Sequence, residues 1–153
     1  MSRVAVIGGG PAGIMAAAAA ADCGHDSVLL EKNEKLGKKL FLTGKGRCNI
    51  TNICDTDDFF ANIPRNPKFL YSALYGFSNT DIVELINANG VPTKAERGKR
   101  VFPASDKSSD VIKALTRHLN SSGAELRLNT EVSGIRKAGS GFELTVNGCR
   151  EEY

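Results

Sequence analysis

Three glycines near the beginning of the chain are spaced for close backbone approach to a ligand. Gly8, Gly10 and Gly13 form a G-x-G-x-x-G pattern between an apolar run, residues 4–7, and an alanine-rich run, residues 14–21. This order predicts a buried strand, a tight turn and a closely packed helix. The first glycine permits the turn, the second leaves room for a phosphate, and the third lets the helix approach the strand. Because N–H groups at a helix start bind anions, the sequence predicts a pyrophosphate site.

An acidic residue follows this turn at the distance expected of a ribose-binding carboxylate. Glu31 stands 18 residues after Gly13, at the end of an apolar run, residues 27–31, that predicts a second strand. A carboxylate there accepts hydrogen bonds from ribose hydroxyls and repels a 2′-phosphate. The pattern therefore disfavours NADP and leaves NAD and FAD as candidates. Without a ligand, the same residues would form an ordinary βαβ unit with a solvated glutamate.

A second glycine-containing stretch, residues 43–52, lies beside a cluster of basic residues. The cluster either forms a solvated face or attracts an anionic cofactor, and it consists of Lys32, Lys35, Lys38, Lys39, Lys45 and Arg47. Within the stretch, Gly44 and Gly46 permit close backbone approach. The stretch is not a Walker A loop, because that motif requires glycine where Lys39 stands and Ser or Thr where Gly46 stands.

Together the two stretches resemble the HI0933-like flavoproteins, the BaiN or aminoacetone oxidase type of FAD-dependent oxidoreductases. The resemblance rests on residues 8–13, on Glu31-Lys32, and most specifically on T-G-K-G-R-C-N-I-T-N at residues 43–52. The segment G-K-R-V-F-P at residues 98–103 is similar to a further motif of this family. The resemblance covers essentially the whole chain and implies a Rossmann-like FAD-binding domain of the glutathione-reductase type.

The resemblance also implies how residues divide along the cofactor. Residues 8–13 would hold the pyrophosphate, Glu31 the adenosine ribose, and the loop of residues 44–49, with Lys39 nearby, the flavin half. By fold analogy, residues 131–132 would offer backbone groups to the adenine. The expected cofactor-binding residues are Gly8, Gly10, Pro11, Ala12, Gly13, Glu31, Lys32, Lys39, Thr43, Gly44, Gly46, Arg47, Cys48, Asn49 and Val132. No catalytic residue can be named, and Cys48 is expected to be structural because no partner cysteine is nearby.

The fold class that these patterns predict is α/β, with one three-layer, doubly wound domain over residues 1–153. A βαβ unit is expected over residues 1–32 and a long crossover over residues 33–122. The crossover should carry helices within residues 32–42, after Asn66-Pro67, over residues 81–89, and from residue 109 to before Gly123. Five aromatic residues at helical spacing are expected in its core: Phe59, Phe69, Tyr71, Tyr75 and Phe77.

The last part of the chain, residues 124–153, predicts the third strand of the sheet and the start of a β-meander. The third strand lies around Leu126, so the expected strand order is third, second, first. Two later runs read as strands, and the second of them closes on Asn147-Gly148, a dipeptide typical of hairpin turns.

The composition of the chain bears on its partners, its location and the state of its cysteines. Twenty Lys and Arg against 17 Asp and Glu leave a net charge of +3, too small to indicate a nucleic-acid partner. No apolar run has the length of a membrane span and no signal peptide is recognisable, so we expect a cytoplasmic protein without membrane contact. The four cysteines lack paired or metal-ligand spacing, which predicts free thiols and no metal site.

Members of the family that this chain resembles are considerably longer than 153 residues. We therefore expect a truncated N-terminal portion of an FAD-dependent oxidoreductase, inactive by itself. A sheet without its fourth parallel strand exposes an edge, so self-association is expected. Two alternatives stay open: a non-catalytic nucleotide-binding or assembly module, and an NAD-binding dehydrogenase domain. The sequence indicates neither the substrate nor whether NAD(P)H serves as a donor.

Overall fold

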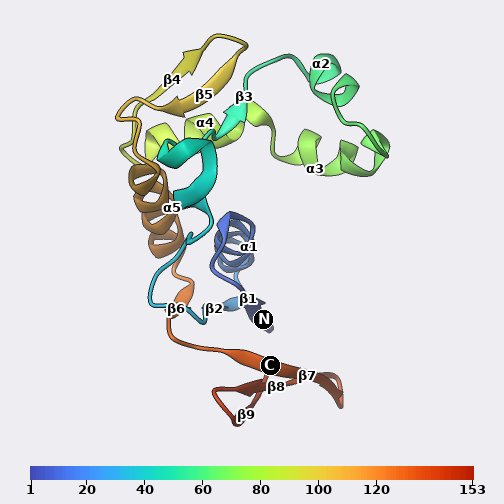
Figure 1. Ribbon diagram of the computed structural model, residues 1–153. Coiled ribbons are helices and arrows are strands. Elements are labelled where there is room, and N and C mark those ends of the chain that lie inside the picture. Colours follow the sequence, from blue (N-terminus) through green and yellow to red (C-terminus); the bar gives the residue numbers. More distant parts are fainter. The chain divides into compact units, whose positions relative to one another are not determined.

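The computed structural model describes residues 1–153, which fold into two compact units (Figure 1). The first unit comprises Met1–Leu40 and Leu115–Tyr153, and the second unit comprises Phe41–Ala114. Helix α5 (Ser108–Ser122) runs across the division between them. None of the helices combines the length and the apolar character that crossing a membrane requires.

The first unit contains a parallel sheet of three strands. These are β1 (Arg3–Ile7), β2 (Asp26–Leu30) and β6 (Glu125–Arg127), paired in the order β1-β2-β6. The predicted strand order is confirmed, and β1 lies at an edge of the sheet. Helix α1 (Pro11–Asp22) follows β1 directly and contacts both β1 and β2. Its C-cap is Cys23, and Gly24 follows with a φ of +81°.

Alternate residues of β2 face opposite layers, as the two-residue period of a strand requires. On one side, the hydroxyl of Ser27 donates to the carbonyl of Ala17 in α1 at 2.9 Å. On the other side, Val28 and Leu30 form a buried cluster with two residues of the C-terminal meander, Leu144 and Val146. The first unit therefore has three layers, and its α/β Rossmann-like fold is confirmed.

The meander of the first unit consists of β7 (Val132–Ala138), β8 (Gly141–Val146) and β9 (Cys149–Glu152), all antiparallel. Its second hairpin turns at Asn147 and Gly148, whose φ angles are +47° and +83°. Two successive positive φ angles characterise the tight hairpin turn that the Asn-Gly dipeptide predicts. That prediction is confirmed.

An ion pair joins the two sheets of the first unit. Arg127 in β6 donates to both carboxylate oxygens of Glu151 in β9, at 2.7 and 2.9 Å, and Tyr153 donates its hydroxyl at 2.8 Å. The hydrogen bonds from Arg127 and then Tyr153 outweigh burial and lower the pKa of Glu151 from 4.5 to about 2. Since the folded-state pKa is lowered, the pair stabilises the fold above about pH 4.5, and this contribution is lost as the pH falls towards 2.

We expect Glu151→Gln to lower the free energy of unfolding by about 1–2 kcal/mol near pH 7. Denaturant unfolding followed by circular dichroism measures this loss. The loss should be smaller near pH 3, because the wild-type protein is then itself losing the stabilisation that the ionised carboxylate provides. Glu152→Gln, at the exposed next position of β9, is the control and should change stability by less than about 0.5 kcal/mol. Equal losses in both variants would contradict a specific role for the Arg127 pair.

The second unit is organised by a small antiparallel sheet that the sequence did not predict. Its strands are β3 (Thr51–Asn52), β4 (Thr93–Glu96) and β5 (Arg100–Pro103), in the order β3-β5-β4. The accompanying helical elements are η1 (Leu40–Gly46), whose backbone is not helical at Thr43, Gly44 and Lys45, α2 (Thr56–Ala61), η2 (Pro67–Leu70), α3 (Tyr71–Gly76) and α4 (Asn79–Ala88). Helix α4 begins with a capping box between Ser78 and Asp81, two residues before the predicted start.

Two predictions are wrong in this part of the chain. Residues 32–39 form bends and turns in place of a helix, because Gly37 has a φ of +67° and Asn33 hydrogen-bonds back to Glu31. The five aromatic residues are also not the core: Phe69 is 86% and Tyr75 72% exposed. The helices that carry them are too short to enclose large rings, and Phe60 is the buried aromatic residue there, with its ring centroid 4.3 Å from that of Tyr71.

Candidate functional site

The turn between β1 and α1 has the geometry that its glycines predict. Gly8 has a φ of +103°, which favours glycine. A Cβ on Gly13 would stand 1.9 Å from the carbonyl oxygen of Gly8, so only glycine permits this contact between turn and helix. A Cβ on Gly10 would meet no protein atom within 4 Å. The space beside Gly10 is therefore open for a ligand.

Helix α1 presents unpaired backbone donors to that space. Gly10 is its N-cap and supplies no side-chain cap, while Pro11 occupies the first turn. Pro11 has no N–H to leave unsatisfied, and the following N–H groups point out of the helix start. Their dipoles favour an anion at this end of the helix.

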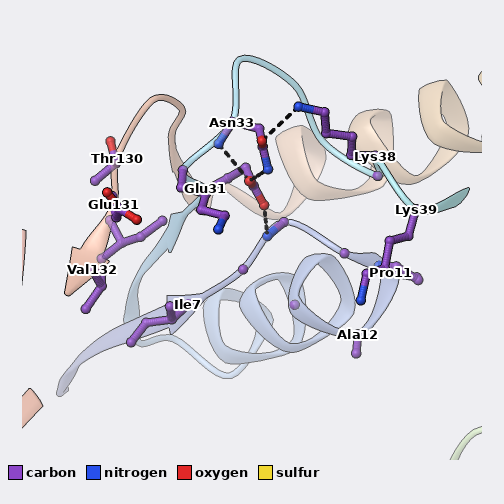
Figure 2. A pocket seen from close by; sticks show the side chains of 17 residues that line it. Ile7, Pro11, Ala12, Glu31, Asn33, Lys38, Lys39, Thr130, Glu131 and Val132 are labelled. Carbon is purple, nitrogen blue, oxygen red and sulfur yellow. Dashed lines mark hydrogen bonds between the residues drawn. The ribbon is translucent and has the colours of Figure 1, made fainter. Parts of the chain in front are cut away.

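The glycine turn forms one wall of a groove of about 600 Å³ in the first unit (Figure 2). This volume lies within the range of small-molecule and cofactor sites. Three stretches line it: the glycine turn, the segment after β2 and the segment before β7. The residues are Ile7, Gly8, Gly9, Gly10, Pro11, Ala12, Gly13, Leu30, Glu31, Lys32, Asn33, Gly37, Lys38, Lys39, Thr130, Glu131 and Val132.

Several residues predicted to bind the cofactor are thus gathered in one groove. They are Gly8, Gly10, Pro11, Ala12, Gly13, Glu31, Lys32, Lys39 and Val132. The other predicted residues, Thr43, Gly44, Gly46, Arg47, Cys48 and Asn49, belong to the second unit.

Glu31 is buried at the end of β2, with 7% of its surface exposed. One carboxylate oxygen accepts a hydrogen bond from the backbone N–H of Gly9 at 2.6 Å. The other accepts from Asn33, through its backbone N–H at 2.8 Å and its side-chain amide at 2.5 Å. Burial opposes ionisation, but the hydrogen bonds from Asn33 and Gly9 and the charge of Lys32 outweigh it and lower the pKa of Glu31. The groove therefore holds a fixed carboxylate anion.

Two groove residues that sequence reasoning missed keep this carboxylate in place. Asn33 binds Glu31 and in turn accepts a hydrogen bond from Lys38 at 3.0 Å (Figure 2). Gly9 must be small as well, because a Cβ there would stand 2.4 Å from Leu36 and 2.9 Å from Glu31. The middle one of three consecutive glycines and an asparagine two residues after the acid were the available signals.

The segment before β7 closes the groove at the end of the sheet. Thr130 donates its N–H to the carbonyl of Glu31 at 2.8 Å, which joins this segment to the end of β2. Both backbone groups of Glu131 pair with Asn147, through its side-chain oxygen at 2.8 Å and its N–H at 2.9 Å. Of the two residues expected near an adenine, Glu131 thus has both backbone groups engaged, and Val132 is the first residue of β7, where it pairs with Val146 in β8.

In the second unit, the loop of residues 43–49 forms a tight left-handed turn. Gly44, Lys45, Gly46 and Cys48 have φ angles of +55°, +56°, +87° and +61°. The N–H of Cys48 closes the turn on the carbonyl of Thr43 at 3.1 Å. With its amide in the orientation that satisfies both of its polar atoms, Asn49 donates its side-chain N–H groups to the carbonyls of Thr51 and Val101 at 3.1 and 3.3 Å. The loop is therefore tied to the small sheet of the same unit.

Cys48 is buried in this loop with 1% exposure, and burial raises the pKa of its thiol despite an opposing contact with Thr43. A raised pKa leaves little thiolate at neutral pH, so we expect iodoacetamide to alkylate Cys48 far more slowly than Cys23 or Cys149, which are exposed. Peptide mass spectrometry after a timed reaction would measure the three rates. Equal rates would show that the loop opens freely, and the structural interpretation of Cys48 would then fail.

Curated relatives match nearly the whole of this chain. It is 33% identical over 152 residues to the 3-dehydro-bile acid delta(4,6)-reductase of Clostridium scindens, covering 98% of this chain and 36% of the relative. It is 31% identical over 143 residues to the ribosomal RNA dihydrouridine synthase of Escherichia coli, covering 94% of this chain and 35% of the relative. The chain thus spans about a third of the length of these two relatives.

Solved structures share the fold at low sequence identity. The 3-ketosteroid-delta4-(5alpha)-dehydrogenase from Rhodococcus jostii RHA1 superposes with a TM-score of 0.67 at 16% identity, over 97% of this chain and 42% of that one. CtdE, solved in complex with FAD, superposes with a TM-score of 0.50 at 16% identity, over 98% of this chain and 36% of that one. Residues 2–152 match the HI0933-like protein Rossmann domain, so the chain belongs to this family.

Proposed function

We propose that this chain is the FAD-binding Rossmann part of a flavin-dependent oxidoreductase. The observation that carries the proposal is the pairing, in one groove, of open space at Gly10 with the fixed carboxylate of Glu31. A pyrophosphate fits the first feature, because a helix N-terminus without a side-chain cap faces it. A ribose fits the second, because a buried carboxylate is a strong acceptor for hydroxyl groups.

The charges of the groove favour a dinucleotide without a 2′-phosphate. Lys32, Lys38 and Lys39 line the groove and attract the negative pyrophosphate. Glu31 would repel a further phosphate at the ribose, which excludes NADP as the preferred ligand. The family motif at residues 43–52, typical of the HI0933-like flavoproteins, and the shared fold with CtdE, solved in complex with FAD, favour FAD over NAD.

Bound FAD would supply the redox chemistry, while the chain would bind and orient it. In this division of labour, Gly8–Gly13 hold the diphosphate, Glu31 holds the ribose, and Val132 lies beside the adenine. The loop of residues 43–49, with Lys39, is proposed to line the flavin half on the strength of the family motif alone. The two relatives are named for unlike substrates, a 3-dehydro-bile acid and ribosomal RNA, so the substrate of the whole protein is left unassigned.

Calorimetric titration of the purified chain with FAD, ADP, NAD and NADP tests this proposal directly. We expect FAD and ADP to bind, and NADP to bind at least about tenfold more weakly than NAD. A visible flavin spectrum that persists after gel filtration would show that the chain retains the entire cofactor. Binding of ADP without retention of FAD would confine the contribution of this chain to the adenosine half. Failure to bind any of the four ligands would contradict the proposal.

A further inference from the structure

The second unit brings together the two sequence motifs that the groove leaves unexplained. One is the loop of residues 43–52, and the other is the segment 98–103 with the turn that follows it. Backbone pairing joins them, because Thr51 in β3 lies opposite Val101 in β5, and Asn52 donates its side-chain amide to the carbonyl of Gly98 at 2.8 Å. Two stretches about fifty residues apart in sequence therefore form one structure.

Arg47 is the side chain that fastens the loop to this structure. Its Nε donates to Asp106 at 2.9 Å, its terminal nitrogen lies 2.7 Å from the same carboxylate, and it also donates to Glu96. The guanidinium stacks on the ring of Phe102, 4.2 Å from the centroid, and that ring is 4% exposed. The charge of the Arg47 guanidinium and its planar face are thus both engaged by other residues of this chain.

The two carboxylates that bind Arg47 also bind a second cation. Lys94 donates to Asp106 at 2.6 Å and lies 3.9 Å from Glu96, so two cations and two carboxylates form a closed network. Such a network leaves no uncompensated positive charge at Arg47 for an anionic ligand. It also reaches three segments at once: the loop, strand β4 and the turn at Asp106 that precedes α5.

We propose that Arg47 is a positioning residue, which clamps the left-handed loop of residues 43–49 through Asp106, Glu96 and Phe102 and does not itself contact the cofactor. The loop needs such a clamp, because Lys45 and Cys48 are non-glycine residues held at positive φ, a strained backbone conformation for such residues. This inference deepens the proposed function, since the loop is the candidate for the flavin half of the site.

Two interpretations of Arg47 predict opposite effects of removing its acidic partner. If Arg47 bound the cofactor phosphate or flavin directly, Asp106→Asn would free the guanidinium, make the site more positive, and leave FAD binding equal or tighter. If Arg47 is a clamp, Asp106→Asn and Arg47→Met should both loosen the loop and weaken FAD binding, by about tenfold. Arg47→Lys should restore only part of the loss, because an ammonium cannot form the forked, stacked contact.

The alkylation rate of Cys48 measures how well ordered the loop is in the absence of cofactor. It therefore tests the role of Arg47 as a clamp independently of the proposed function. We expect Asp106→Asn and Arg47→Met to raise this rate at least about tenfold, at a temperature where circular dichroism shows both variants folded. Asp58→Asn removes an exposed carboxylate that lies 3.8 Å from Lys99 in the same unit, and this control should leave the rate unchanged. Unchanged protection of Cys48 in both clamp variants, or tighter FAD binding by Asp106→Asn, would overturn the inference. If wild-type protein binds none of FAD, ADP, NAD and NADP, the proposed function fails while the Cys48 rates still test the clamp.

Discussion

Gly10→Ala should abolish binding of FAD and ADP while leaving the fold intact. Gly10 has an extended backbone, with φ of −79° and ψ of 175°, which alanine adopts without strain. Its new methyl group would meet no protein atom within 4 Å, so the free energy of unfolding should change by less than about 1 kcal/mol. The methyl group would occupy the space proposed for the diphosphate, so the dissociation constant should rise by about 100-fold or more.

Titration calorimetry and denaturant unfolding of the same variant separate these two effects. Gly76→Ala is the matched control, because its Cβ also meets no atom within 4 Å and its backbone is free of positive φ, but it lies outside the groove. Gly13→Ala provides the opposite case: its Cβ would stand 1.9 Å from the Gly8 carbonyl, so folding itself should suffer. Retained ADP affinity in a folded Gly10→Ala protein would show that the diphosphate does not lie on this turn.

The first unit could be predicted from sequence because local signals and packing agree there. The glycine turn, the apolar run of β2 and the Asn147-Gly148 hairpin each have a short-range physical cause, and the strand order follows from right-handed crossover rules. The second unit lacked such signals. Strand β3 has two residues, and its pairing with β5 depends on contacts between segments about fifty residues apart, which periodicity does not reveal.

The residues of the candidate site also differ in how far the sequence predicts them. Gly8, Gly13 and Glu31 were found because their spacing reflects backbone geometry. Asn33 was missed because its role depends on a side chain that folds back on Glu31, within a segment expected to be helical. Arg47 was singled out from the family motif, but its contacts with Asp106 and Phe102 appear only when the chain is folded. Sequence spacing therefore located the residues that line the groove better than it located the residues that support them.

Glu31→Gln should weaken binding of FAD and ADP by about 1.5–3 kcal/mol, or roughly 10- to 150-fold, because the ribose hydroxyls lose a charged acceptor. The structure adds a second effect. The carboxylate accepts from Gly9 and twice from Asn33, and an amide would turn a donor towards one of these donors. We therefore also expect a loss of about 1–3 kcal/mol in the free energy of unfolding.

The pH dependence of binding gives an independent measurement of Glu31. Because its pKa is lowered from 4.5, the carboxylate stays ionised above that value, and its contribution to stability and binding is lost only as the pH falls through the lower, folded-state pKa. Wild-type affinity for FAD should therefore be level above about pH 5, whereas the Gln variant should be weak throughout. The variant should also discriminate less between NAD and NADP, since the repulsion of a 2′-phosphate is removed. Glu34→Gln removes an exposed charge 3.7 Å from Lys38 and serves as the control. If the two variants bind ADP alike, the ribose lies away from Glu31, and the groove would have to hold the nucleotide in another orientation.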